Sequence, residues 1–221
     1  MTKETIIGFI SNVLAVILGI VITFAVQGMI DNHHDKKEVA SALELVRTEL
    51  STNIDDIQVM SGYLQQEKRS ARYLLDNRNS LGDCPRDSVE YHSSMLFADA
   101  AITVSYDALE LLKSSSLFQK IGDNTVAMAI IRAYDTCGAI VTNMNRHIEN
   151  RTVLLESSIN PQSASLYASE GAIDIGKFIQ TAYGSYAVGR IANQPDVTEF
   201  NDVSDVEDAL EAIEKYIHKR R

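Results

Sequence analysis

The sequence predicts an all-α protein in which a single N-terminal transmembrane helix continues into a helical stalk and then a helical bundle. Three observations lead to this fold class. An uncharged run of 26 residues separates Glu4 from Asp31, apolar residues recur in steps of three and four along several later segments, and no segment of useful length alternates like a strand. A chain of 221 residues that is 45% hydrophobic, with three prolines, can also bury a sizeable core.

The uncharged run predicts a membrane anchor over residues 1–30, followed by a soluble helical domain over residues 31–221. A helix rises about 1.5 Å per residue, so about 20 apolar residues are enough to cross about 30 Å of hydrocarbon. A cleaved signal peptide would have an apolar region of only about 7 to 15 residues. The apolar run here continues from Ile6 to Val26, which favours an uncleaved anchor.

One face of the anchor carries small side chains at every fourth position, beside one amide side chain. Such a stripe lets a second helix approach closely, and an amide in hydrocarbon gains from a partner. We therefore expect a homo-oligomer through the anchor, although small residues are also common in membrane helices that do not associate. The contact residues would be Ser11, Asn12, Ala15, Gly19 and Thr23.

The charged residues indicate an orientation and exclude one class of partner. Lys36 and Lys37 follow the anchor closely, whereas Lys3 precedes it, so the positive-inside rule places the soluble domain in the cytoplasm. The net charge of −10 belongs to the part after the anchor and repels phosphate backbones. We therefore expect no nucleic-acid partner, while the lipid bilayer is a partner of the anchor.

After the anchor, a heptad-like seam predicts a long stalk helix over about residues 36–76. No proline separates the two, so anchor and stalk are expected to form one helix. The seam could pack against other copies of the chain or against other helices of the same chain. Asn53 could fix the register between copies or face water, and Glu67 interrupts the seam again. The seam residues nearest the anchor are Val39, Leu43, Val46, Leu50, Asn53 and Ile57.

Turn signals divide the middle of the domain. Gly82 and Pro85 predict a loop over residues 77–87, followed by short helices over about residues 88–101 and 106–113. A turn and cap at residues 122–124 then predict a long second helix over about residues 124–158. Its apolar seam would be Ile130, Tyr134, Cys137, Val141, Met144 and Ile148.

Two more helices are expected towards the C-terminus. Scattered apolar residues predict one helix over about residues 172–192. Ser204 and Glu207 have the spacing of a capping box and begin an amphipathic closing helix over about residues 204–219.

The sequence predicts no catalytic residues, no metal ligands and no cofactor. Gly171 to Phe178 follows the pattern G-x-x-x-x-G-K-F, which lacks the Ser or Thr that a phosphate-binding loop needs for Mg²⁺. His34 and Glu38 have the spacing of two metal ligands, with His33 adjacent, but two ligands make a weak site.

The two cysteines are too few for a disulfide framework. Cys84 and Cys137 lie far apart in the sequence, so they could pair or simply be buried thiols.

Two segments together resemble a family of uncharacterised bacterial single-pass membrane proteins found notably in the Bacteroidetes. They are L-G-I-V-I-T-F-A-V-Q-G-M-I, from Leu18 to Ile30, and Y-D-A-L-E-L-L-K-S-S-S-L-F-Q-K-I, from Tyr106 to Ile121. The family usually has glycine where this chain has Ser116, and a tryptophan just after the anchor that this chain lacks. The resemblance implies an anchor in the bacterial inner (cytoplasmic) membrane, a helical stalk and a long helix. It implies no catalytic residues, because no activity is established for the family.

These patterns lead to one principal functional hypothesis and two alternatives. The principal one is a non-enzymatic, membrane-anchored helical scaffold or accessory subunit that self-associates within a larger membrane assembly and has a membrane-protein partner. The first alternative is a ligand-binding helical sensor module that signals through a partner protein, which a polar-lined cavity in the bundle would favour. The second is an enzyme whose site is assembled from residues distant in the sequence.

Overall fold

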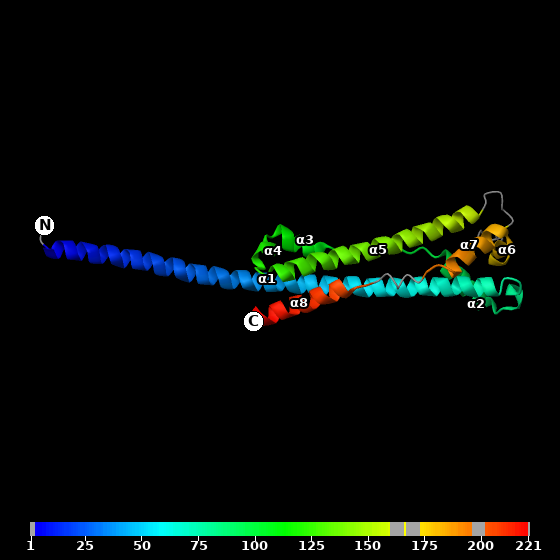
Figure 1. Ribbon diagram of the computed structural model, residues 1–221, viewed down its shortest axis with the longest axis horizontal. Helices are drawn as coiled ribbons and strands as arrows, with labels where there is room; N and C mark the ends of the chain where they lie inside the picture. The colour runs from blue at the N-terminus through cyan, green and yellow to red at the C-terminus, as the bar shows by residue number, and fades with distance from the viewer. Residues whose placement is uncertain (1–2, 160–165, 167–172, 196–201, 221) are drawn as a thin grey trace.

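One helix runs along the whole length of this elongated, all-helical molecule (Figure 1). The computed structural model describes residues 3–159, 166, 173–195 and 202–220, and for residues 3–33 and 220 it describes the helical backbone alone. Helix α1 extends from Lys3 to Asp76 without a break. Its backbone therefore joins the predicted anchor region to the predicted stalk, because no proline interrupts the hydrogen-bond ladder.

The half of the bundle nearer the N-terminus combines α1 with two other long helices. Helix α5, from Asn124 to Ser158, runs in the same direction as α1, and α8, from Ser204 to Arg220, returns along both (Figure 1). Asp123 begins α5 by accepting hydrogen bonds from the N–H groups of Thr125 and Val126. Helix α5 therefore has the bounds and the cap that the sequence predicts.

Short elements close the far end of the molecule. A 3-10 helix, Leu81–Asp83, leads into α2, Arg86–Phe97, which packs on α1. Helices α6, Ile175–Gln180, and α7, Ala182–Ala192, stand where one helix over about residues 172–192 was predicted, and that prediction is wrong. Thr181 has extended backbone angles and its hydroxyl accepts from the N–H of Gly184 at 2.9 Å, so it ends α6 and caps α7.

The buried apolar side chains form two clusters. The first joins α1 to α3, α5 and α8, and it ends at Leu64 on α1 and Ile148 on α5. The second joins the end of α1 to α2, α6 and α7, and it begins at Ala71 on α1 and Leu155 on α5. A polar layer separates the two clusters, because Glu67, Ser70 and Arg151 are buried between these limits.

The stalk seam packs inside the chain. Its apolar residues have exposed fractions of 0 to 1% and belong to the first cluster with α5 and α8. Of the two packing partners that the heptads left open, the structure therefore shows helices of the same chain. The residues are Val39, Leu43, Val46, Leu50 and Ile57.

An extended segment, residues 98–106, provides the return path between the parallel helices α1 and α5. This stretch was predicted to be partly helical, up to about residue 101, and that prediction is wrong. Extended chain covers about 3.3 Å per residue against about 1.5 Å for a helix, so nine residues return about 30 Å. Alternate residues face inward, with Ile102 buried between the exposed Ala101 and Thr103.

Amide side chains on the helices pair with the backbone of this segment as a neighbouring strand would. Asn53 on α1 donates to the carbonyl of Ser105 and accepts from its N–H, both at 3.0 Å. Asn145 on α5 does the same for Ile102, at 2.7 and 3.2 Å. Asn53 is therefore buried, and it neither fixes a register between copies nor faces water. Pairing of this kind is required because a buried backbone group without a partner is costly.

The segment ends at a carboxylate that begins the next helix. Helix α3, Asp107–Ser114, has its Ala108 N–H within 3.0 Å of Glu49 on α1, which also accepts from the hydroxyls of Ser105 and Tyr134. Burial raises the pKa of Glu49, but these hydrogen bonds together lower it by more than burial raises it. The pKa of Glu49 is therefore below its ordinary value. The carboxylate thereby fixes the start of α3 to both long helices.

Helix α4, Leu117–Lys120, follows a strained serine. Ser116 has φ 61°, in the left-handed region that favours glycine.

Among the residues whose side chains are described, one helix, α5, is long and apolar enough to cross a membrane by length and composition. Its apolar face, however, is buried against α1 and α8, and it carries the buried Arg151. Helix α5 is thus a core helix of the bundle.

Replacing Asn145 by alanine should lower the free energy of unfolding by about 2 kcal/mol, because both backbone groups of Ile102 lose their partner. Asn143 is an exposed residue of the same helix, and its alanine variant should change stability by less than about 0.5 kcal/mol. Urea unfolding of the full chain in mild detergent, followed by circular dichroism, measures both. Equal losses in the two variants would contradict the pairing role.

Replacing Ser116 by glycine should raise the free energy of unfolding by about 1 kcal/mol, because glycine adopts φ 61° without strain. The matched control is Ser51→Gly in the regular part of α1, which should instead cost about 0.5 kcal/mol. The same unfolding experiment compares them, and a loss of stability in both variants would refute the strain at Ser116.

Candidate functional site

The polar layer between the two apolar clusters contains an ion pair that is almost completely buried. Arg151 on α5 is 4% exposed and Glu67 on α1 is 0% exposed. The Nε of Arg151 lies 3.2 Å from Oε1 of Glu67, close enough for an ion pair but not aligned for a hydrogen bond. Burying two charges costs several kcal/mol for each ion unless hydrogen bonds compensate, so such a pair requires an explanation.

Arg151 also holds the end of α2 and the start of the extended segment. Its Nη1 donates to the carbonyls of Leu96 and Ala98, both at 3.0 Å, and Tyr63 on α1 donates to the same Ala98 carbonyl at 3.2 Å. These contacts orient the guanidinium group from one side. Nη2 is buried and has no hydrogen-bond partner within the described part of the chain.

The carboxylate and a neighbouring imidazole lack partners in the same way. Both oxygens of Glu67 and Nε2 of His147 are buried without a hydrogen bond to any described residue. Burial raises the pKa of Glu67 to about 7, and the Arg151 guanidinium opposes this rise only in part. Burial also lowers the pKa of His147, and the positive charge of Arg151 adds to the effect. Glu67 therefore changes protonation state near neutral pH, whereas the lowered pKa keeps His147 neutral there.

Beside this layer, a cavity of about 700 Å³ opens between α5 and α7. Its volume lies within the usual range of small-molecule sites, about 300 to 1,000 Å³. Helix α5 and helix α7 contribute both apolar and polar side chains, and Asn193, Gln194 and Pro195 after α7 also line it. The charged, polar and larger apolar side chains of the lining include His147, Asn150, Arg151, Leu154, Tyr186 and Arg190.

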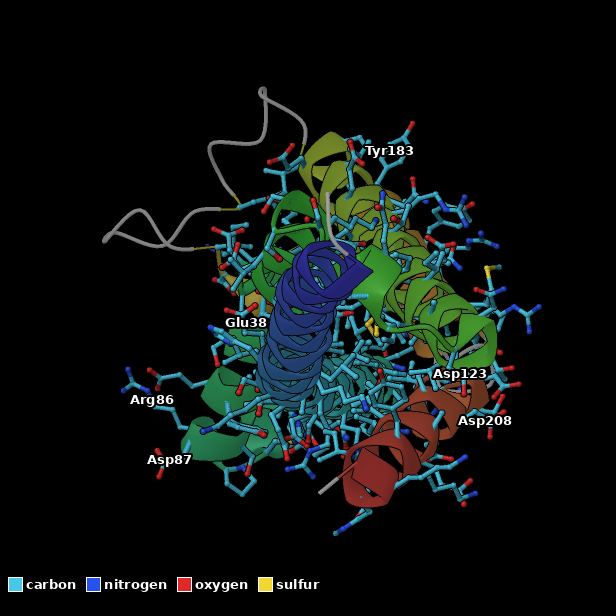
Figure 2. The ribbon with its side chains drawn as sticks, turned by 90° about the vertical axis from the view of Figure 1, so that its left-hand side faces the viewer. Glu38, Arg86, Asp87, Asp123, Tyr183 and Asp208 are labelled. Atoms are coloured by element: carbon cyan, nitrogen blue, oxygen red, sulfur yellow. The ribbon has the colours of Figure 1, made fainter. Side chains whose placement is uncertain are left out.

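Among the described residues, the lining of this cavity contains cations and no carboxylate. Three other cavities on the described surface each include carboxylates: Glu90 and Asp174 in one, Glu211 and Glu214 in another, and Glu38 in the third. Many acidic side chains point outwards from the bundle, as Glu38, Asp87, Asp123 and Asp208 do in Figure 2. A positive cavity in a chain of net charge −10 is a local feature that composition does not explain.

The site residues predicted from the sequence lie elsewhere. The side chains of Ser11, Asn12, Ala15, Gly19 and Thr23 fall outside the described residues, and the stalk seam is buried in the bundle core. His34 and Glu38 form an exposed ion pair at 3.6 Å, and among the described residues no group of three potential metal ligands occurs. Cys84 and Cys137 are both free thiols.

Two possible catalytic features have structural explanations. Phe178, in the phosphate-loop-like stretch, is a fully buried core residue. Ser70 lies 3.0 Å from Nδ1 of His92, a hydroxyl–imidazole contact of the kind that activates nucleophiles. Ser70 is 0% exposed, however, so a substrate could not reach its hydroxyl.

The sequence reasoning missed Arg151 although a signal was present. In the seam of α5, the steps of three and four continue from Ile148 through position 151 to Leu155, and an arginine occupies the middle position. Glu67 occupies a seam position on α1 in the same way. Opposite charges that interrupt the apolar seams of two helices indicate that the helices meet there.

Comparisons of the chain with models of protein families, with curated proteins and with solved structures found no match. The resemblance to bacterial single-pass membrane proteins therefore stays a prediction, and the candidate site depends on its geometry alone.

The pH dependence of stability should reveal the buried carboxyl group. A folded pKa of about 7, above the ordinary value of 4.5, means that Glu67 contributes stability below about pH 4.5 that is lost as the pH rises to about 7. The wild type should therefore lose about 3 kcal/mol relative to Glu67→Gln over this range. Urea unfolding of both proteins across this pH range measures the difference.

The control for this experiment is Glu49→Gln. Because the pKa of Glu49 is lowered in the folded state, the wild type should gain stability relative to this variant as the pH rises through the acidic range. Parallel pH profiles for the wild type and Glu67→Gln would show that Glu67 is not buried as described.

Proposed function

We propose that this chain is a ligand-binding helical sensor module, anchored in a bacterial inner membrane by residues 1–30, that signals through a membrane-protein partner. The observation that carries the proposal is the cavity between α5 and α7, whose lining includes a buried arginine with N–H groups that have no partner among the described residues. Sites for small molecules typically combine an apolar lining with a few polar groups that fix the orientation of the ligand.

The position of the cavity supports a role in sensing. Arg151 lines the cavity and also forms the ion pair with Glu67. Glu67 belongs to α1, the helix that begins at Lys3. A ligand that shifts the Arg151 guanidinium therefore acts on the same helix as the proposed anchor. Arg151 also holds the carbonyls of Leu96 and Ala98, so the return segment would respond as well.

The scaffold hypothesis has less support from the geometry. The heptad seam that led us to expect self-association through the stalk is filled by helices of the same chain. Self-association through Ser11, Ala15, Gly19 and Thr23 remains a prediction, and it is compatible with a sensor.

A panel of probes of matched shape tests for a ligand site. Benzoate, benzamide, benzamidine and phenyl phosphate share one ring and differ in charge, and at least one should raise the thermal unfolding midpoint of the full chain in mild detergent. The variant Asn150→Trp fills the mouth of the cavity and should abolish that rise. Asn143→Trp, an exposed substitution on the same helix but outside the lining, should keep it.

Two results would contradict the proposal. One is that no probe stabilises the wild type. The other is that the rise in Asn150→Trp equals the rise in Asn143→Trp.

A further inference from the structure

We infer that the cavity takes a small organic oxyanion, a carboxylate or a phosphate ester, whose charged group contacts Arg151, and that Glu67 takes up one proton from water as it binds. This inference rests on the proposed function and adds the chemical class of the ligand and its coupling to protons.

The charge of the lining selects an anion. Arg151 and Arg190 contribute two positive charges, neutral His147 contributes a polar edge, and none of the described residues that line the cavity is acidic. A cation would be repelled by both arginines, and a neutral ligand could accept hydrogen bonds from them but would lack the attraction between opposite charges. Leu154, Tyr186 and Ile191 add apolar surface, which an organic anion uses and a free inorganic ion does not.

Arg151 has the donors that an oxyanion requires. A guanidinium group has five N–H bonds in a planar fork that matches carboxylate and phosphate oxygens. Nη1 is engaged by two carbonyls, whereas neither Nε nor Nη2 makes a hydrogen bond to any described residue. The fork is therefore held in place with three unused N–H bonds, and because Nε and Nη2 are buried, a ligand reaches them only by displacing the side chains that cover them.

The buried charges explain the proton. With Glu67 ionised, Arg151 is already neutralised, and a ligand carboxylate would leave an excess negative charge in the polar layer. Protonation of Glu67 removes that excess and frees the guanidinium for the ligand. Both carboxylate oxygens lack hydrogen bonds to described residues, so no donor is lost when one oxygen becomes a hydroxyl.

Other titratable groups surround this pair, and one of them could take the proton instead. Arg151 and His147 face the layer from α5, Arg190 lies at the cavity on α7, and Tyr63 lies near Glu67 on α1. Asp99 on the return segment interacts with Tyr63, and His92 on α2 contacts Ser70. Of these, His147 is the serious rival, because it lines the cavity and is neutral when the ligand is absent.

Calorimetric titration of the full chain in mild detergent tests the inference. Benzoate should bind at least about tenfold more tightly than benzamide, and benzamidine should not bind. Titrations in Tris and in HEPES, which differ in ionisation enthalpy, should show an uptake of about one proton at about pH 8. Benzoate affinity should be constant below about pH 7 and fall by up to about tenfold per pH unit above it.

Variants identify the group that takes up the proton. Glu67→Gln should still bind benzoate but with no proton uptake, whereas His147→Gln should keep the uptake. Uptake that survives in Glu67→Gln and disappears in His147→Gln would overturn the role of Glu67. The wild type in two buffers measures the proton uptake itself, so that measurement does not depend on the stability of either variant, which serve only to assign the proton to a group.

The remaining outcomes separate the inference from the proposed function. Benzamide binding as tightly as benzoate would refute the oxyanion class and leave a ligand site standing. Benzoate binding without any proton uptake would refute the coupling alone. Comparing the affinities of phenyl phosphate and benzoate tells which oxyanion the arginine prefers. If none of the four probes binds, the ligand site itself is refuted.

Discussion

The packing depends on one constraint: two parallel helices need a connection that runs back beside them, and that connection must have its backbone hydrogen bonds satisfied. Residues 98–106 return in extended form beside α1 and α5, with no neighbouring strand among the described residues. Its backbone groups are therefore hydrogen-bonded by side chains instead, those of Asn53, Asn145 and Arg151. The need for such side chains explains why polar residues occupy positions in otherwise apolar helix interfaces, and it brings an arginine into the protein interior.

How far the sequence predicts the fold depends on the range of the interactions involved. Local signals were sufficient for α5, where Asp123 caps the helix as expected, and for the closing helix α8. They failed for residues 98–101, which were predicted to continue a helix that ends at Phe97, because this end is fixed by Arg151, more than 50 positions away in the sequence. They failed again at Thr181, where an N-cap hydrogen bond to Gly184 divides a helix that apolar periodicity alone would continue.

The candidate site was less accessible to sequence reasoning than the fold. Glu67 was visible as an interruption of the seam, and Arg151 could have been found by extending the seam of α5 by one step. Neither position reveals that the two side chains meet, because that depends on the parallel arrangement of α1 and α5. The cavity also needs α7, whose Arg190 is distant in the sequence from both. A buried arginine with three roles, in the return segment, in the ion pair and at the cavity, is a product of the tertiary structure.

The length of α1 also bears on the electrostatic surroundings of the cavity. If the membrane ends near residue 30, Glu67 lies 37 residues further along the same helix, which corresponds to about 55 Å at about 1.5 Å per residue. The negative surface potential of a bacterial membrane decays within a Debye length, about 8 to 10 Å in physiological salt. A solute that enters between α5 and α7 would therefore be sampled at its bulk concentration, free of the depletion that anions experience beside lipid headgroups.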